Sequence, residues 1–161
     1  MSYAPSAAVL EKIERAIAAL PERSAALLPV LRAIQEEAGF VPPEAEAWAA
    51  AKLGILPVRV REVMSFYTML RRAPAGRTTI QVCRNLSCTL AGGEGLIAAL
   101  RRELGIVPGG GDTAEDGAFT LVEAECLGNC DHAPCLQIDG VDYGPVTREE
   151  AIALIREIKG R

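Results

Sequence analysis

Four cysteines occur in two short clusters, and these residues have the clearest potential for chemistry in the chain. The clusters are Cys83-Arg-Asn-Leu-Ser-Cys88 and Cys126-Leu-Gly-Asn-Cys130. Four thiolates are what a [2Fe–2S] cluster requires, two on each iron. Structural zinc also accepts four thiolates, but its cysteine pairs are more often separated by two residues than by the four and three found here. The spacing therefore favours a [2Fe–2S] site and leaves zinc as the alternative.

Two other residues near these clusters could also interact with a metal. Cys135 is the fifth cysteine and begins a segment of alternating polarity, so we expect a small buried side chain there. His132 is the only histidine and lies two residues after Cys130. Imidazole replaces thiolate in some iron–sulfur centres, but four cysteines already complete a cluster. We therefore expect His132 to influence the local field without binding metal.

The composition of the chain excludes several classes of protein. A net charge of −4 over 161 residues, with no basic stripe, argues against a nucleic-acid-binding protein. Five cysteines are an odd number, which does not suit a disulfide framework. The N-terminus lacks the pattern of a signal peptide, and no apolar run approaches the roughly 20 residues that span a bilayer. We therefore expect a cytoplasmic protein with free thiols and no segment inserted in the membrane.

The first half of the chain predicts helices only. Apolar residues recur at helical spacing over residues 6–20 and 27–39, with Pro29 in the first turn of the second segment. Pro43 and Pro57 are suited to the first positions of two further helices, and Gly54 to the end of the third. Together these segments predict a small helical bundle.

The second half predicts a different order, namely strand, helix, strand, hairpin and helix. Each cysteine cluster follows a predicted strand, so we expect both clusters in loops at one edge of a sheet. Asp139-Gly140 is a strong hairpin signal, and Thr147-Arg-Glu-Glu150 is a capping box that opens the last helix. The predicted elements are strands at 78–83, 118–124, 135–138 and 141–143 and helices at 92–104 and 147–158, with a glycine-rich loop at 108–111.

The residues around the cysteines resemble a known family. The segments Cys83-x4-Cys88-x-Leu90-x-Gly92 and Glu125-Cys126-Leu-Gly-Asn-Cys130-Asp-x-x-Pro134 are similar to the 24 kDa subunit family of NADH:quinone oxidoreductase. In the first half, Gln35-Glu-Glu-x-Gly39-Phe-Val-Pro42-Pro43 and Val63-Met-Ser65-Phe66-Tyr67 resemble the same family. The likeness covers about residues 10–158, which is nearly the whole chain.

This resemblance implies an α/β architecture with an N-terminal helical bundle at residues 1–74 and a thioredoxin-like [2Fe–2S] ferredoxin domain at residues 75–161. It implies that Cys83, Cys88, Cys126 and Cys130 bind the cluster and that the chain has no catalytic residue. Cys135 departs from the family, which usually has a residue without a thiol there.

The resemblance also implies a function, which is electron transfer close to the FMN of an NADH dehydrogenase. The partner is then a flavoprotein subunit that binds FMN and NADH, within a larger multi-subunit oxidoreductase peripheral to the inner membrane. The alternatives are the equivalent subunit of an NAD-linked hydrogenase or formate dehydrogenase, and a free-standing thioredoxin-like ferredoxin.

Overall fold

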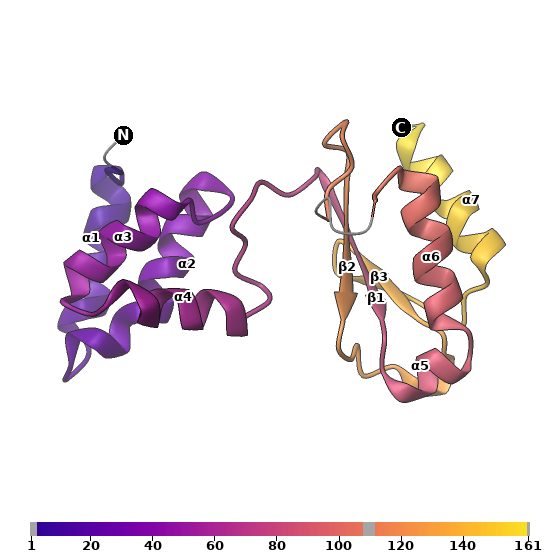
Figure 1. Cartoon of the computed structure of the whole chain (residues 1–161), viewed down its shortest axis with the longest axis horizontal. Helices are drawn as coiled ribbons and strands as arrows, with labels where there is room; N and C mark the ends of the chain where they lie inside the picture. Colours follow the sequence, from indigo (N-terminus) through magenta and orange to yellow (C-terminus); the bar gives the residue numbers. More distant parts are fainter. Residues whose placement is uncertain (1–2, 108–111, 161) are drawn as a thin grey trace. The chain divides into compact units, whose positions relative to one another are not determined.

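The computed structural model describes residues 3–107 and 112–160. Its first unit, Met1–Pro74, contains helices and no strand among these residues (Figure 1). Ser6 caps the first helix through its side chain, and Pro43 and Pro57 occupy the first positions of the third and fourth helices. The predicted helices are therefore confirmed to within about two residues. The elements are α1 (Ala7–Ala18), η1 (Arg23–Ala26), α2 (Leu27–Ala38), α3 (Pro43–Leu53) and α4 (Pro57–Phe66).

The core of this unit is aliphatic and contains one buried acidic side chain among the described residues. Glu46 of α3 accepts from the guanidinium groups of Arg61, at 3.1 Å, and Arg72, at 2.7 Å. Two charged donors satisfy a carboxylate that burial alone would destabilise. This pair of contacts ties α4 and the segment after it to α3. The largest fully buried side chains of the unit are Ile13, Leu31, Ile34, Val30 and Val41.

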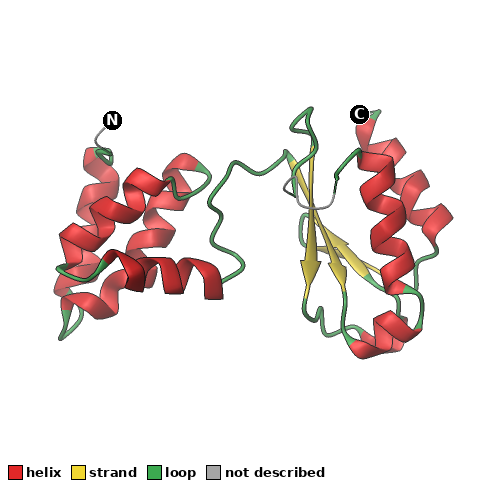
Figure 2. Cartoon of the chain, viewed as in Figure 1, coloured by secondary structure: helices red, strands yellow, loops and turns green. Residues whose placement is uncertain are grey.

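The second unit, Ala75–Arg161, is built on a mixed sheet of four strands in the order β2-β1-β3-β4 (Figure 2). β1 pairs parallel with β2 and antiparallel with β3, and β3 and β4 form the predicted hairpin. The elements are β1 (Thr78–Cys83), α5 (Leu86–Leu90), α6 (Gly93–Leu104), β2 (Phe119–Ala124), η2 (Cys130–His132), β3 (Leu136–Ile138), β4 (Val141–Tyr143) and α7 (Arg148–Lys159).

Helices α6 and α7 lie side by side on one face of this sheet (Figure 1). Ile80 and Val82 alternate on β1 and are fully buried together with Leu121 of β2 and Leu100 of α6, as expected where one face of a strand meets a helix layer. On the opposite pleat of β1, Thr79 and Gln81 are only partly buried, and Cys83 at the end of the strand is buried. The core of this unit is therefore on the helical side of the sheet.

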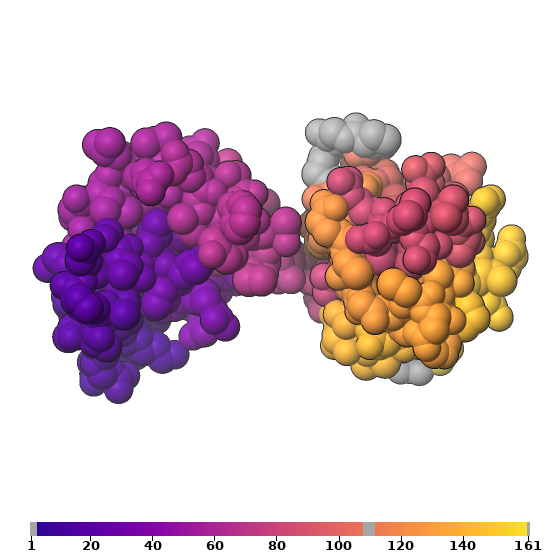
Figure 3. Space-filling model, turned by 90° about the horizontal axis from the view of Figure 1, so that it is seen from below, coloured from indigo at the N-terminus to yellow at the C-terminus, as the bar shows by residue number. Residues whose placement is uncertain are grey.

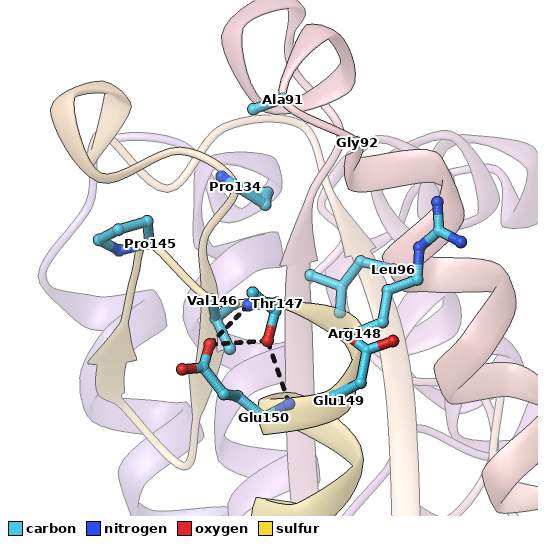
Figure 4. Close-up of a pocket in the computed structure, with 10 residues that line it drawn as sticks. All are labelled: Ala91, Gly92, Leu96, Pro134, Pro145, Val146, Thr147, Arg148, Glu149 and Glu150. Carbon is cyan, nitrogen blue, oxygen red and sulfur yellow. Dashed lines mark hydrogen bonds between the residues drawn. The ribbon is translucent and has the colours of Figure 1, made fainter.

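The start of α7 shows the predicted capping box (Figure 4). The Glu150 backbone N–H donates to Thr147 Oγ1 at 3.2 Å, and the Thr147 N–H donates to Glu150 Oε2 at 2.8 Å. The hydrogen bonds from Thr147 lower the pKa of the Glu150 carboxyl. Two N–H groups that have no partner within the helix are satisfied in this way.

Three short elements were not predicted from the sequence. η1 precedes α2, α5 follows β1 and contains Cys88, and η2 begins at Cys130, so that these two cysteines lie in short helical turns and not in loops as expected. The predicted glycine-rich loop at 108–111 lies outside the described residues. Among the helices that the structure describes, none is long and apolar enough to cross a bilayer.

Candidate metal centre

The two cysteine segments adjoin because the strands before them are parallel neighbours. The register pairs Cys83, the last residue of β1, with Ala124, the last residue of β2. Beyond the strands, the Arg84 N–H donates to the Ala124 carbonyl at 2.9 Å, and the Asn85 side chain donates to the Glu125 carbonyl at 3.1 Å. Figure 3 shows the segment that follows each strand next to the other at the surface of the unit.

An ion pair reinforces this contact between the two segments. Arg84 directly follows Cys83, and Glu125 directly precedes Cys126. The Arg84 Nε atom lies 3.2 Å from Glu125 Oε2, and the same guanidinium lies 3.7 Å from Glu123. These side chains are largely exposed, so the pair contributes little to stability. It adds one contact between two residues that adjoin cysteines.

Local hydrogen bonds explain why the chain turns into α5 directly after β1. The Leu86 N–H donates to Asn85 Oδ1 at 2.7 Å, and the Thr89 hydroxyl donates to the Arg84 carbonyl at 3.0 Å. Asparagine favours such turns because its side chain competes for nearby backbone groups. As a result Cys88 is buried at 1% exposure, whereas Leu86 and Leu90 are 70% and 79% exposed.

The structure brings two of the four predicted ligands together with the fifth cysteine. The sulfur atoms of Cys83, Cys88 and Cys135 lie within 4.8 Å of one another, and all three residues are buried. The Cys88 and Cys135 Sγ atoms are 3.6 Å apart. Cys126 and Cys130 are exposed and lie outside this group of mutually close sulfurs. The position of Cys135 beside the predicted ligands is the feature that the sequence did not indicate.

The division of the cysteines has a physical explanation if they bind a [2Fe–2S] cluster. Each iron takes two thiolates, and the bridging sulfides separate the two irons. Thiolates on different irons therefore lie farther apart than thiolates on the same iron, so four ligands do not form one tight group. Cys83 and Cys88 suit one iron, and Cys126 and Cys130 are available in the adjoining segment for the other. A lone zinc ion would require four close donors.

Backbone N–H groups point at the sulfur of Cys83. Burial opposes ionisation of this thiol, but hydrogen bonds, the largest of them from the backbone of Asn85 and Leu127, outweigh it, so its pKa is lowered. Burial raises the pKa of Cys88, and it raises the pKa of Cys135 to about 12. Of these three buried thiols, Cys83 is therefore the one whose surroundings favour the thiolate form. Hydrogen bonds of this kind also stabilise metal-bound thiolates.

The second segment provides a further donor to sulfur. The Gly128 N–H donates to Cys126 Sγ at 3.3 Å. A Cβ at Gly128 would have no protein atom within 4 Å. Glycine is favoured here by the backbone φ of 74°, which residues with a Cβ rarely adopt.

His132 lies in η2, beside Cys130 but apart from the buried sulfurs. Its Nδ1 atom is 3.0 Å from Asn129 Oδ1 and 3.2 Å from Asp131 Oδ1, and the side chain is half exposed. Its ring is therefore engaged with polar neighbours on its own turn. The expectation that His132 is not a ligand stays a prediction.

A groove of about 540 Å³ lies at the start of α7, but it does not have the donors of a metal site (Figure 4). Thr147 and Glu150 line it and are already joined in the capping box. No cysteine is among its lining residues. The two cysteine segments, and not this groove, therefore form the candidate centre.

Comparisons with known proteins agree with this centre. The family model described as thioredoxin-like [2Fe–2S] ferredoxin matches residues 13–159. The chain is 44% identical over 133 residues to an NADH-quinone oxidoreductase subunit of Rhizobium meliloti, covering 83% of this chain and 77% of the relative. It is 40% identical over 138 residues to NADH-quinone oxidoreductase subunit 2 of Thermus thermophilus, covering 85% and 75% respectively.

A solved structure has a similar fold. The crystal structure of an NAD+-reducing [NiFe]-hydrogenase in the H2-reduced state matches with a TM-score of 0.64 at 23% identity. The match covers 84% of this chain and 22% of the hydrogenase chain. At this identity the similarity concerns the fold alone.

The start of α6 leaves no space beside the first cysteine segment, which gives a prediction with a matched control. A Cβ at Gly93 would lie 2.8 Å from the Cys88 carbonyl oxygen and 3.3 Å from that of Cys83, whereas a Cβ at Gly95 would meet only the flexible end of Arg148. We expect Gly93→Ala to lower the free energy of unfolding by about 1–3 kcal/mol and to reduce the iron content. Gly95→Ala on the same helix should leave both nearly unchanged, as measured by urea unfolding and iron analysis. Equal effects from both substitutions would show that this contact is not important.

Proposed function

Because the chain belongs to the family of thioredoxin-like [2Fe–2S] ferredoxins, which its NADH-quinone oxidoreductase relatives share, we propose that it is an electron-transfer subunit. In this proposal it carries a [2Fe–2S] cluster close to the FMN of an NADH dehydrogenase module, as part of NADH:quinone oxidoreductase. Cys83 and Cys88 hold one iron, and Cys126 and Cys130 hold the other. No residue of the chain acts as a catalytic acid, base or nucleophile.

One observation carries this proposal. The two segments that contain the predicted ligands begin at the same edge of the sheet. They follow Cys83 and Ala124, which are the paired last residues of the parallel strands β1 and β2. The donor chemistry fits, since all four residues are cysteines without a disulfide and thiolates are the usual ligands of this cluster. In this proposal the centre lies between the buried thiols of Cys83 and Cys88 and the exposed thiols of Cys126 and Cys130.

The protein's own groups set the properties of this centre. When bound, a [2Fe–2S] cluster accepts and releases one electron, and its charge changes from about −2 to −3. The backbone N–H groups that approach Cys83, together with the N–H of Gly128 at Cys126, stabilise negative charge on sulfur. The burial of Cys83 and Cys88 keeps water from one side of the centre.

The surface beside the ligands fits the docking of a partner. Leu86 and Leu90 flank the buried Cys88 on α5 and are mostly exposed, and Cys126 and Cys130 are exposed in the adjoining segment. A flavoprotein subunit that binds FMN and NADH and covers this apolar surface would bring its flavin near the ligands. In the assembled enzyme the chain would then be peripheral to the inner membrane.

The test uses the complex purified from the native cell through a tag on this chain. We expect a flavoprotein subunit to co-purify and NADH to reduce the centre, which is detected as the paramagnetic signal of a reduced [2Fe–2S] cluster. The chain without its partner should be reduced by dithionite but not by NADH.

Two results would contradict the function. A chain that purifies alone from its native cell would favour a free-standing ferredoxin, and direct reduction of the isolated chain by NADH would remove the need for a flavoprotein. Co-purification with hydrogenase or formate dehydrogenase subunits would retain electron transfer but overturn the assignment to quinone reduction.

A second prediction concerns the ligand set. The full chain should contain two irons and two labile sulfides, and Cys126→Ser should remove or badly destabilise the cluster because it deletes a ligand. Cys135→Ser should keep both irons, as measured by iron and sulfide analysis after anaerobic reconstitution. A similar loss of iron from both variants would mean that Cys135 is a ligand. A full chain that contains one zinc ion and has no visible absorption would exclude the cluster altogether.

A further inference from the structure

We propose that the thiol of Cys135 donates a hydrogen bond to the ligand sulfur of Cys88 and thereby raises the reduction potential of the cluster. The inference rests on the proposed function, since it concerns the same centre. It gives a role to a fifth sulfur that the cluster does not need as a ligand.

The backbone holds Cys135 next to the ligands. The Cys83 N–H donates to the Cys135 carbonyl at 3.2 Å, and the antiparallel register pairs Val82 with Leu136. Cys135 therefore directly precedes β3 and lies beside Cys83, the first predicted ligand, at the end of β1. Its side chain is 1% exposed, and its sulfur lies 3.6 Å from that of Cys88.

The coordination of iron leaves no position for this third sulfur. Cys83 and Cys88 would supply the two thiolates that one iron takes, so the iron would need no third thiolate although the sulfurs of Cys83, Cys88 and Cys135 are all within 4.8 Å of one another. Cys135 therefore remains a thiol. An S–H group is a weak donor, and the Cys88 sulfur lies 3.6 Å from it, within the distance of a hydrogen bond between sulfur atoms.

The surroundings of Cys135 keep the thiol in this position. Gly144 covers it from the adjoining segment, because a Cβ at Gly144 would lie only 2.9 Å from the Cys135 Cβ. Leu127 and Ala133 pack against the same group of sulfurs. The site therefore has no room for a larger side chain but accepts alanine or serine, which define the test.

The effect on potential follows from charge. Reduction adds one negative charge to a centre that already carries about −2, so a hydrogen bond to its sulfur stabilises the reduced state more than the oxidised state. Loss of the donor should lower the potential. The backbone N–H of Cys135 also reaches the Cys88 sulfur, and a substitution of the side chain leaves that bond in place.

The experiment is a redox titration of the full chain, reconstituted with iron and sulfide and followed by its paramagnetic signal. At the midpoint of the unsubstituted chain, Cys135→Ala should raise the ratio of oxidised to reduced cluster about threefold to tenfold, the range of one weak hydrogen bond. A tenfold change corresponds to about 59 mV for one electron. Cys135→Ser retains a donor and should restore or exceed the original potential, and both variants should keep two irons.

Each other outcome has a distinct meaning. Identical midpoint potentials for all three chains would overturn the inference and leave the proposed function intact. Equal decreases of the midpoint potential in Cys135→Ala and Cys135→Ser would do the same, because they would indicate a purely structural effect. Loss of iron from Cys135→Ala would overturn it by making Cys135 a ligand. Absence of a [2Fe–2S] cluster in the unsubstituted chain would defeat the proposed function itself.

Discussion

The parallel pairing of β1 with β2 is the constraint on which the centre depends. It places the last residues of both strands, Cys83 and Ala124, opposite each other, so both cysteine segments start from one edge of the sheet. A shift of this register by one residue would turn every side chain of a strand to the other face. The alternation of Ile80 and Val82 against the helices resists such a shift, because both are fully buried. The hydrophobic core therefore positions the residues that we propose as metal ligands.

The centre combines a rigid side and an accessible side. Cys83, at the end of β1, and Cys88, within α5, are buried, while Cys126 and Cys130 are exposed. A redox subunit needs both properties, since burial limits the access of water to the cluster and exposure permits close approach of a partner. The hydrogen bonds to Cys83 and Cys126 show how the same segments can also adjust the charge tolerated on sulfur.

Local patterns predicted much of this architecture. The capping box at Thr147, the hairpin at Asp139-Gly140 and the strands that precede Cys83 and Cys126 are all visible in short stretches of sequence. The contact of Cys135 with Cys88 was not predictable, because it depends on the register of β3 against β1, and pairing between distant strands leaves no signal in one sequence. The fold of α5 was missed for a related reason, since one helical turn is too short to show a period.

Chemical accessibility tests the central claim, that the two segments bind one cluster together, most directly. Exposed thiols react with iodoacetamide as thiolates, so Cys126 and Cys130 should be alkylated rapidly unless metal binds them. In the coloured full chain we predict that mass spectrometry finds both unmodified, and that removal of iron makes them reactive. Rapid alkylation of Cys126 and Cys130 in a chain that keeps its iron and its colour would contradict the account.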